Sequence, residues 1–249
     1  GAGGLAGVGG CVEFGSGMAE DLGQAVKWDQ AAADRGHAPG QCCLGFCYES
    51  GRGAEQNWAE AVKWYRAAAD QNYPRAQCNL AWCYEHGKGV KQDYAMAAQL
   101  YRAAAEQDYP RGQLCLGFCC ERGRGVPVNK EEAASWYRKA AEQGDEDGAC
   151  CLGYLYETGE GVEQSWEQAA VWYRKSADLG LPRGQCNLAW CYEHGKGVEH
   201  IDGFPTKATH IRSAGPAHTG ALCALLAEGW DLESAVQIAN AAASLAITH

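Results

Sequence analysis

The sequence has no long hydrophobic stretch and few basic residues for its length. No run of about 18 apolar residues occurs in the 249-residue chain, so we expect no transmembrane helix. Lysine and arginine number 21 against 31 acidic residues, which gives a formal net charge of −10. Nucleic-acid backbones and anionic membranes repel such a chain, so we expect neither as a partner and favour a protein or a basic peptide.

Motifs of several catalytic and metal-binding classes are also missing. There is no Ser-x-x-Lys and no Lys-Thr-Gly, so the signature of penicillin-binding enzymes is absent. The chain has 14 cysteines, yet no Cys-x-x-Cys occurs and no Cys/His cluster has zinc spacing. We therefore expect no cofactor and no metal.

What the sequence does contain is a regular 36-residue period. Tryptophans fall on this period, with Leu100 at the one position that lacks them: Trp28, Trp64, Trp136 and Trp172. Gly-x-Gly turns follow the same period: Gly15/Gly17, Gly51/Gly53, Gly87/Gly89, Gly123/Gly125, Gly159/Gly161 and Gly195/Gly197. A fixed period of this size is typical of a repeat array, whose units stack into an extended surface rather than a closed pocket.

Each repeat carries the start and stop signals of two helices. In one repeat the pattern predicts a first helix over 41–50, which Gly51 ends because glycine tolerates the left-handed conformation. Asn57 is predicted to cap a second helix that runs to about residue 70, and Glu60 completes a capping-box-like pair. The second helix is expected to turn four residues inward: Ala61, Trp64, Tyr65 and Ala68.

Several repeats share one pattern in phase, for example Ala76-Gln77-x-x-Leu80-x-x-x-Tyr84-x-x-Gly87-x-Gly89-Val90 followed by Ala97-x-x-x-Tyr101-Arg102-x-Ala104-Ala105. This pattern resembles the Sel-one-like repeats (SLR), which are related to tetratricopeptide repeats. Over residues 21–200 the resemblance implies an all-α fold, a right-handed α/α solenoid of helix–turn–helix repeats. It implies an adaptor that binds a protein or peptide on its concave face, and it implies no chemistry. The glycine-rich residues 1–20 are expected to form a degenerate half repeat.

The cysteines of the array fall on the predicted first helices. Adjacent helices lie about 8–10 Å apart, whereas a disulfide needs Cα atoms closer than about 7 Å. We therefore expect free, buried thiols that act as small hydrophobic groups, and a reducing, cytoplasmic compartment. The alternative is a secreted relative of the helical cysteine-rich bacterial SLR proteins. In those proteins the resemblance implies paired cysteines, and that pairing pattern is absent here.

A column of glutamates at the ends of the first helices is the candidate binding site: Glu49, Glu85, Glu121, Glu157 and Glu193. One interpretation is an acidic ladder that binds a basic peptide. The alternative is local ion pairing, either with the basic residue of the following turn or with a basic column of the second helices. That basic column comprises Arg66, Arg102, Arg138 and Arg174.

The period ends at Ile201, and residues 201–249 carry a different pattern that includes Ser213-Ala214-Gly215-Pro216. This pattern resembles the C-terminal end of ribokinase-like sugar kinases. The resemblance implies that Ala214 and Gly215 are an anion-hole remnant and that Pro216 occupies the position of the catalytic aspartate. Proline can neither accept a proton nor offer an amide to an anion, so we predict an inactive remnant and no enzyme.

Three functions therefore stay open: a protein-binding adaptor, a remnant of a carbohydrate kinase, and a structural scaffold without a specific ligand. Two hypotheses apply to the tail itself. Residues 219–248 are predicted to form a helical hairpin that caps the last first helix, because terminal repeats need cover. The other hypothesis is that the tail is the product of a truncation or fusion.

Overall fold

A computed structural model describes residues 22–198, and this part of the chain contains ten helices and no strand. The chain divides into two compact units, Gly1–Val128 and Asn129–His249. The first unit contains α2 (Leu22–Ala33), α3 (Ala38–Ser50), α4 (Trp58–Ala69), α5 (Pro74–His86), α6 (Tyr94–Ala105) and α7 (Pro110–Arg122). The second contains α8 (Lys130–Glu142), α9 (Glu146–Thr158), α10 (Trp166–Asp178) and α11 (Pro182–His194). The predicted N-terminal half repeat and the tail lie outside the described residues.

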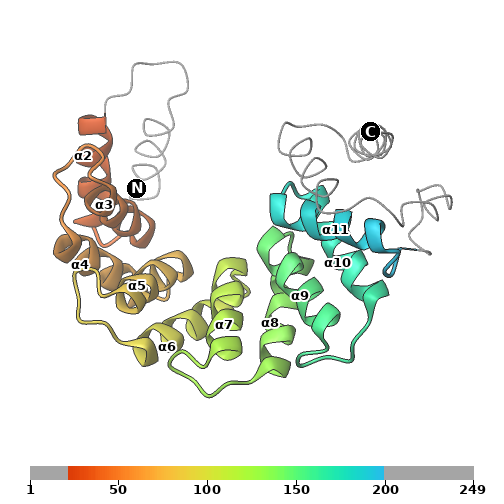
Figure 1. The fold of residues 1–249 in the computed structure, drawn as a ribbon. Coiled ribbons are helices and arrows are strands. Elements are labelled where there is room, and N and C mark those ends of the chain that lie inside the picture. The colour runs from red at the N-terminus through yellow and green to blue at the C-terminus, as the bar shows by residue number, and fades with distance from the viewer. Residues whose placement is uncertain (1–21, 199–249) are drawn as a thin grey trace, which may run out of the picture. The chain divides into compact units, whose positions relative to one another are not determined.

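The helices alternate between two roles, as the sequence period predicts. The first helices of the repeats are α3, α5, α7, α9 and α11, and the second helices are α2, α4, α6, α8 and α10. Within each unit, consecutive helices pack against each other. Within each unit, a first helix also contacts the next first helix, α5 with α7 and α9 with α11, so the first helices of each unit form a layer of their own (Figure 1). We call this the first-helix layer.

The second helices begin at the predicted capping residues. Asn57 Oδ1 accepts hydrogen bonds from the amides of Ala59 and Glu60, both at 3.1 Å. The equivalent side chains of three further repeats also cap their helices: Asp93, Asn129 and Ser165. The reciprocal half of the predicted capping box does not form. The Asn57 amide donates instead to the Tyr48 carbonyl at 2.9 Å, and Glu60 pairs with Lys63 at 3.2 Å.

The first helices begin three residues earlier than the sequence pattern predicts, at Ala38 rather than residue 41. In α3, α5, α7 and α11 the reason is a proline at the first or second position, whose fixed φ suits a helix start and whose missing N–H has no partner there anyway. In α9, which has no proline, the Asp145 side chain caps the start of the helix. The turn before each first helix contains a residue in the left-handed conformation. It is Asn72 with φ 59° and Asp108 with φ 56° in two repeats, and glycine in the others.

The two glycines of each Gly-x-Gly turn have different tasks. Gly87 adopts φ 64° and donates its amide to the Cys83 carbonyl, which ends α5. Gly89 also has a positive φ, but its place is fixed by contact, since a Cβ there would lie 2.3 Å from the Trp58 carbonyl oxygen. The turn after a first helix thus packs directly on the start of the preceding second helix.

Tyrosines form the centre of the core. Four of them, one on each of four second helices, are no more than 2% exposed: Tyr65, Tyr101, Tyr137 and Tyr173. Gly45 and Gly153 make room for two of these rings, because a Cβ at either would lie 2.7 Å from Tyr65 or Tyr173. A leucine at the equivalent position of each first helix is also buried: Leu44, Leu80, Leu116, Leu152 and Leu188. Trp64, expected on the same inner face, is only half-buried.

Candidate functional site

Three of the five predicted glutamates accept a hydrogen bond from a buried tyrosine 16 residues later in the chain. Glu157 accepts from the Tyr173 hydroxyl at 2.5 Å and Glu85 from the Tyr101 hydroxyl at 3.1 Å, and Glu49 binds Tyr65 in the same way. Burial, and then the hydrogen bond to the glutamate, raise the pKa of Tyr173 above its ordinary value, so this hydroxyl stays a neutral donor. Each bond ties the end of a first helix to the next second helix.

The remaining two glutamates, Glu121 and Glu193, lie half-buried at the ends of α7 and α11. The structure therefore places the column at equivalent positions of successive repeats. Sequence reasoning did not identify the tyrosine partners. The signal was present, because a tyrosine follows the glutamate at the same spacing in four repeats.

The basic column of the second helices binds tyrosines of the following first helix. Arg66 donates to the Tyr84 hydroxyl at 2.9 Å and Arg138 to the Tyr156 hydroxyl at 2.5 Å, and Arg174 donates to Tyr192. Glu85 forms an ion pair with a residue that was not among the predicted partners. Its Oε1 lies 2.8 Å from the guanidinium of Arg124, which stands in the Gly-x-Gly turn of the following repeat, 39 residues later.

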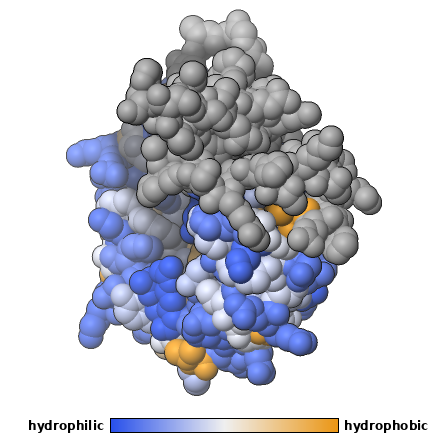
Figure 2. Space-filling model, turned by 45° about the vertical axis from the view of Figure 1, so that its right-hand side comes forward, coloured by the Kyte–Doolittle hydropathy of each residue, from blue (hydrophilic) through white to orange (hydrophobic). Residues whose placement is uncertain are grey.

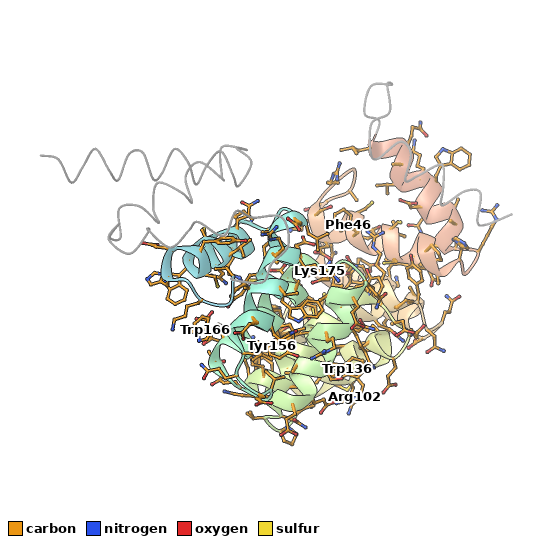
Figure 3. The ribbon with its side chains drawn as sticks, turned by 90° about the vertical axis from the view of Figure 1, so that its right-hand side faces the viewer. Phe46, Arg102, Trp136, Tyr156, Trp166 and Lys175 are labelled. Atoms are coloured by element: carbon orange, nitrogen blue, oxygen red, sulfur yellow. The ribbon has the colours of Figure 1, made fainter. Side chains whose placement is uncertain are left out.

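Two aromatic stacks of the same composition occur, one in each unit. In the second unit, the Trp190 ring stacks on Trp166 with centroids 5.4 Å apart and on His194 with centroids 4.1 Å apart. Trp166, labelled in Figure 3, stands at the start of α10. Trp58, Trp82 and His86 repeat the arrangement in the first unit. The two stacks belong to segments 74–90 and 182–198, which differ at a single position.

A pocket of about 310 Å³ opens between α9 and α11 on the first-helix layer. Glu157 of α9 and three residues of α11, Cys186, Asn187 and Trp190, line it. The pocket thus combines a member of the predicted glutamate column with a ring of the aromatic stack. Sequence reasoning singled out other tryptophans, those of the 36-residue lattice, and missed Trp190.

The twelve cysteines of the described residues are free thiols. Burial raises the pKa of Cys42, Cys83 and Cys191 to about 12. The thiolate is the reactive form of cysteine, so these thiols are hydrophobic core groups rather than nucleophiles. Within residues 22–198 no group of His, Cys, Asp and Glu has an arrangement that could hold a metal ion.

The anion-hole remnant predicted at Ala214 and Gly215, and Pro216 beside it, lie outside the described residues. None of the helices between residues 22 and 198 is both long and apolar enough to cross a membrane.

Comparison with known proteins locates two families along the chain. The Sel1 repeat pattern matches five successive segments, residues 3–37, 38–73, 74–109, 110–145 and 148–181. The pattern of pfkB family carbohydrate kinases matches residues 189–249. No protein of curated function matches the chain.

Solved structures support the repeat assignment. The chain is 39% identical, with a TM-score of 0.75, to a protective antigen of uropathogenic Escherichia coli that displays an SLR fold. That match covers 85% of this chain but 44% of the antigen, so this chain spans less than half the antigen's length. A Sel1 repeat protein from Oxalobacter formigenes is 31% identical with a TM-score of 0.72, and the match covers 85% of this chain and 83% of that one.

A more distant likeness shows the fold alone. An immunity protein of Pseudomonas aeruginosa is 18% identical with a TM-score of 0.54, over 97% of this chain and 83% of that one. The repeat matches, the two structures above 30% identity and the helix–turn–helix packing agree. The chain belongs to the Sel1 repeat family, and its fold is an all-α solenoid of helix–turn–helix repeats.

Proposed function

We propose that the protein is a non-catalytic adaptor that binds a protein or peptide through its first-helix layer. Sel1 repeats mediate protein interactions, and membership of the family supports this class of function. The observation that carries the proposal is the pocket on that layer, where Glu157 and Trp190 meet between α9 and α11. An aromatic wall beside a carboxylate suits a peptide side chain that has an apolar stem and a positive end.

The mostly hydrophilic surface of the described residues suits a partner that binds through polar and charged groups. On the face that Figure 2 shows, the described residues are mostly hydrophilic, and their hydrophobic atoms form small separate spots. The formal net charge of −10 adds a field that attracts a basic segment and raises its rate of association at low salt. A basic peptide is therefore the partner class that we propose.

Selection from a displayed library of random 12-residue peptides tests the adaptor function, with the full chain as bait. We expect enriched peptides that carry Arg or Lys, whose binding weakens as salt rises and weakens in the Asn187→Leu variant. The control is Glu85→Gln, which changes a glutamate whose two oxygens are already engaged by Tyr101 and Arg124. A selection that enriches no peptide above background would leave a scaffold without a specific ligand as the better reading.

We also propose that the pfkB-like tail is catalytically inactive. The supporting observation is Pro216, which stands where the resemblance to sugar kinases places the catalytic base. Incubation of the full chain with ATP and a panel of common sugars should give no sugar phosphate above the background of ATP hydrolysis. Phosphorylation of any of these sugars by the purified chain would contradict the proposal.

A further inference from the structure

We infer that the pocket between α9 and α11 binds the guanidinium of an arginine side chain. The inference rests on the proposed adaptor function and assigns a defined residue class to one defined site. Its evidence is the set of hydrogen-bonding groups that the pocket leaves open, the single negative charge among them, and the aromatic wall beside them.

Glu157 keeps one carboxylate oxygen open. Its Oε2 accepts the Tyr173 hydroxyl at 2.5 Å, while no described residue donates to its Oε1. Glu85 occupies the same position two repeats earlier, but both of its oxygens are engaged, Oε2 by Tyr101 and Oε1 by Arg124 at 2.8 Å. Glu157 therefore offers a cationic ligand an open carboxylate oxygen, and Glu85 does not.

The difference follows from the central residue of the Gly-x-Gly turn in the following repeat. Arg124 reaches Glu85, whereas the counterpart for Glu157 is Lys196. The Lys196 ammonium lies over the Trp166 ring, 5.5 Å from its centroid, where the ring quadrupole attracts it. In the first unit Lys88 takes the same place over Trp58, at 5.7 Å, and Glu49 likewise has its Tyr65 bond on a single oxygen.

The other polar group of the pocket is also an acceptor. Asn187 directs its Nδ2 to the Cys150 sulfur at 3.6 Å, so its side-chain carbonyl oxygen is left without a donor among the described residues. The nearby cation Arg183 is already held, since it donates to Cys150 at 3.3 Å and Cys151 at 3.5 Å and lies 3.6 Å from the Asp147 carboxylate. A ligand for this pocket must therefore bring hydrogen-bond donors and positive charge.

Guanidinium fits this demand better than ammonium does. Its planar fork offers five donors in fixed directions and can reach a carboxylate and an amide oxygen at once, whereas ammonium is a compact, strongly hydrated charge. The methylene stem of arginine would pack on Trp190. That ring is held in place between Trp166 and His194, so little side-chain entropy is lost when a ligand packs against it.

The test uses the full chain with its nine tryptophans labelled with ¹⁵N at the indole nitrogen. The Trp190→Phe variant assigns the Trp190 signal. The probes are N-acetyl-arginine amide and N-acetyl-citrulline amide, which match in shape and differ in charge. We expect the arginine probe to shift the Trp190 signal in a saturable way, and the citrulline probe to shift it at least tenfold less at equal concentration.

Two glutamate variants localise the effect. Glu157→Gln keeps an acceptor for Tyr173 but removes the charge, and we expect it to weaken binding of the arginine probe at least tenfold. Glu85→Gln is the matched control, and its Trp190 titration should equal that of the unchanged protein. Equal shifts with both probes, or unchanged affinity in Glu157→Gln, would overturn the inference. If peptides still bind in the display experiment, the adaptor function survives and only the pocket assignment fails.

Discussion

The two glycines of one turn allow a sharp test of how the repeats pack. Gly87 and Gly89 both have left-handed backbones, with φ 64° and 68°. A Cβ on Gly87 would find its nearest neighbour, Gln92 Cβ, at an ordinary 3.4 Å, whereas a Cβ on Gly89 would lie 2.3 Å from the Trp58 carbonyl oxygen and 2.5 Å from its carbon. Alanine at the two positions therefore has the same conformational cost and a very different steric cost.

The magnitudes follow from these two terms. A left-handed alanine costs about 1–2 kcal/mol, and the reduced freedom of the unfolded chain returns about 0.4–1 kcal/mol. Gly87→Ala should thus lower the free energy of unfolding by about 1 kcal/mol. Gly89→Ala adds overpacking against a backbone that cannot rotate away, about 1–3 kcal/mol more, for a total of about 2–4 kcal/mol.

Urea denaturation of the full chain, followed by tryptophan fluorescence and by far-ultraviolet circular dichroism, measures both free energies. The structure requires Gly89→Ala to be the less stable variant by both probes. If the two variants unfold at the same urea concentration, Gly89 is needed for its left-handed backbone alone, and the inferred close contact between the turn and the helix is refuted.

Three further predictions address other contacts. Tyr173→Phe removes the donor to Glu157 and should lower the free energy of unfolding by about 1.5–3 kcal/mol. Tyr101→Phe should lower it by less, because Glu85 keeps its ion pair with Arg124. Equal losses in urea denaturation would argue against that ion pair. Burial raises the pKa of Cys83 to about 12 from an ordinary 9.0, so the unfolded chain loses this proton first. The contribution of the Cys83 thiol to the free energy of unfolding is complete below pH 9 and falls by about 1.4 kcal/mol per pH unit above it. Cys83→Ala should therefore flatten the decline of the melting temperature between pH 9 and 10.5. A steeper decline in that variant would contradict the assignment. Removal of residues 203–249 should lower the melting temperature and promote self-association if the tail caps the array, and an unchanged, monomeric product would exclude the cap.

Most of the fold could be read from the sequence because its signals are local. Asn57 and the equivalent residues cap helices by bonds to amides two or three residues away, and Gly51 or Asn72 adopts its backbone within a single turn. The helix starts were less accessible. Proline at the head of α5 reads as a residue after a helix exit as easily as one that opens the next helix.

The candidate site depended on contacts that the period does not display. The glutamates were identified as a column. Which of them keeps an open oxygen depends on whether the Gly-x-Gly turn of the following repeat carries arginine or lysine, and on a tryptophan that attracts the lysine. Trp190 lies off the tryptophan lattice, so its place beside Glu157 emerges from the packing of α9 on α11. Side-chain competition of this kind is a tertiary property.

The bonds within and between the repeats have a consequence for how such chains grow and shrink. Gln71 reaches Gln41 and Gln107 reaches Gln77 across 30 residues, and these bonds, like the Glu–Tyr bonds at an interval of 16, lie within one repeat. The Arg–Tyr bonds, at an interval of 18, join a second helix to the first helix of the next repeat. A duplication or loss of one whole period therefore keeps every bond within a repeat, and a bond between repeats persists wherever the new neighbour carries the equivalent tyrosine. The twin segments 74–90 and 182–198, which lie three periods apart, have the form that such copying leaves behind.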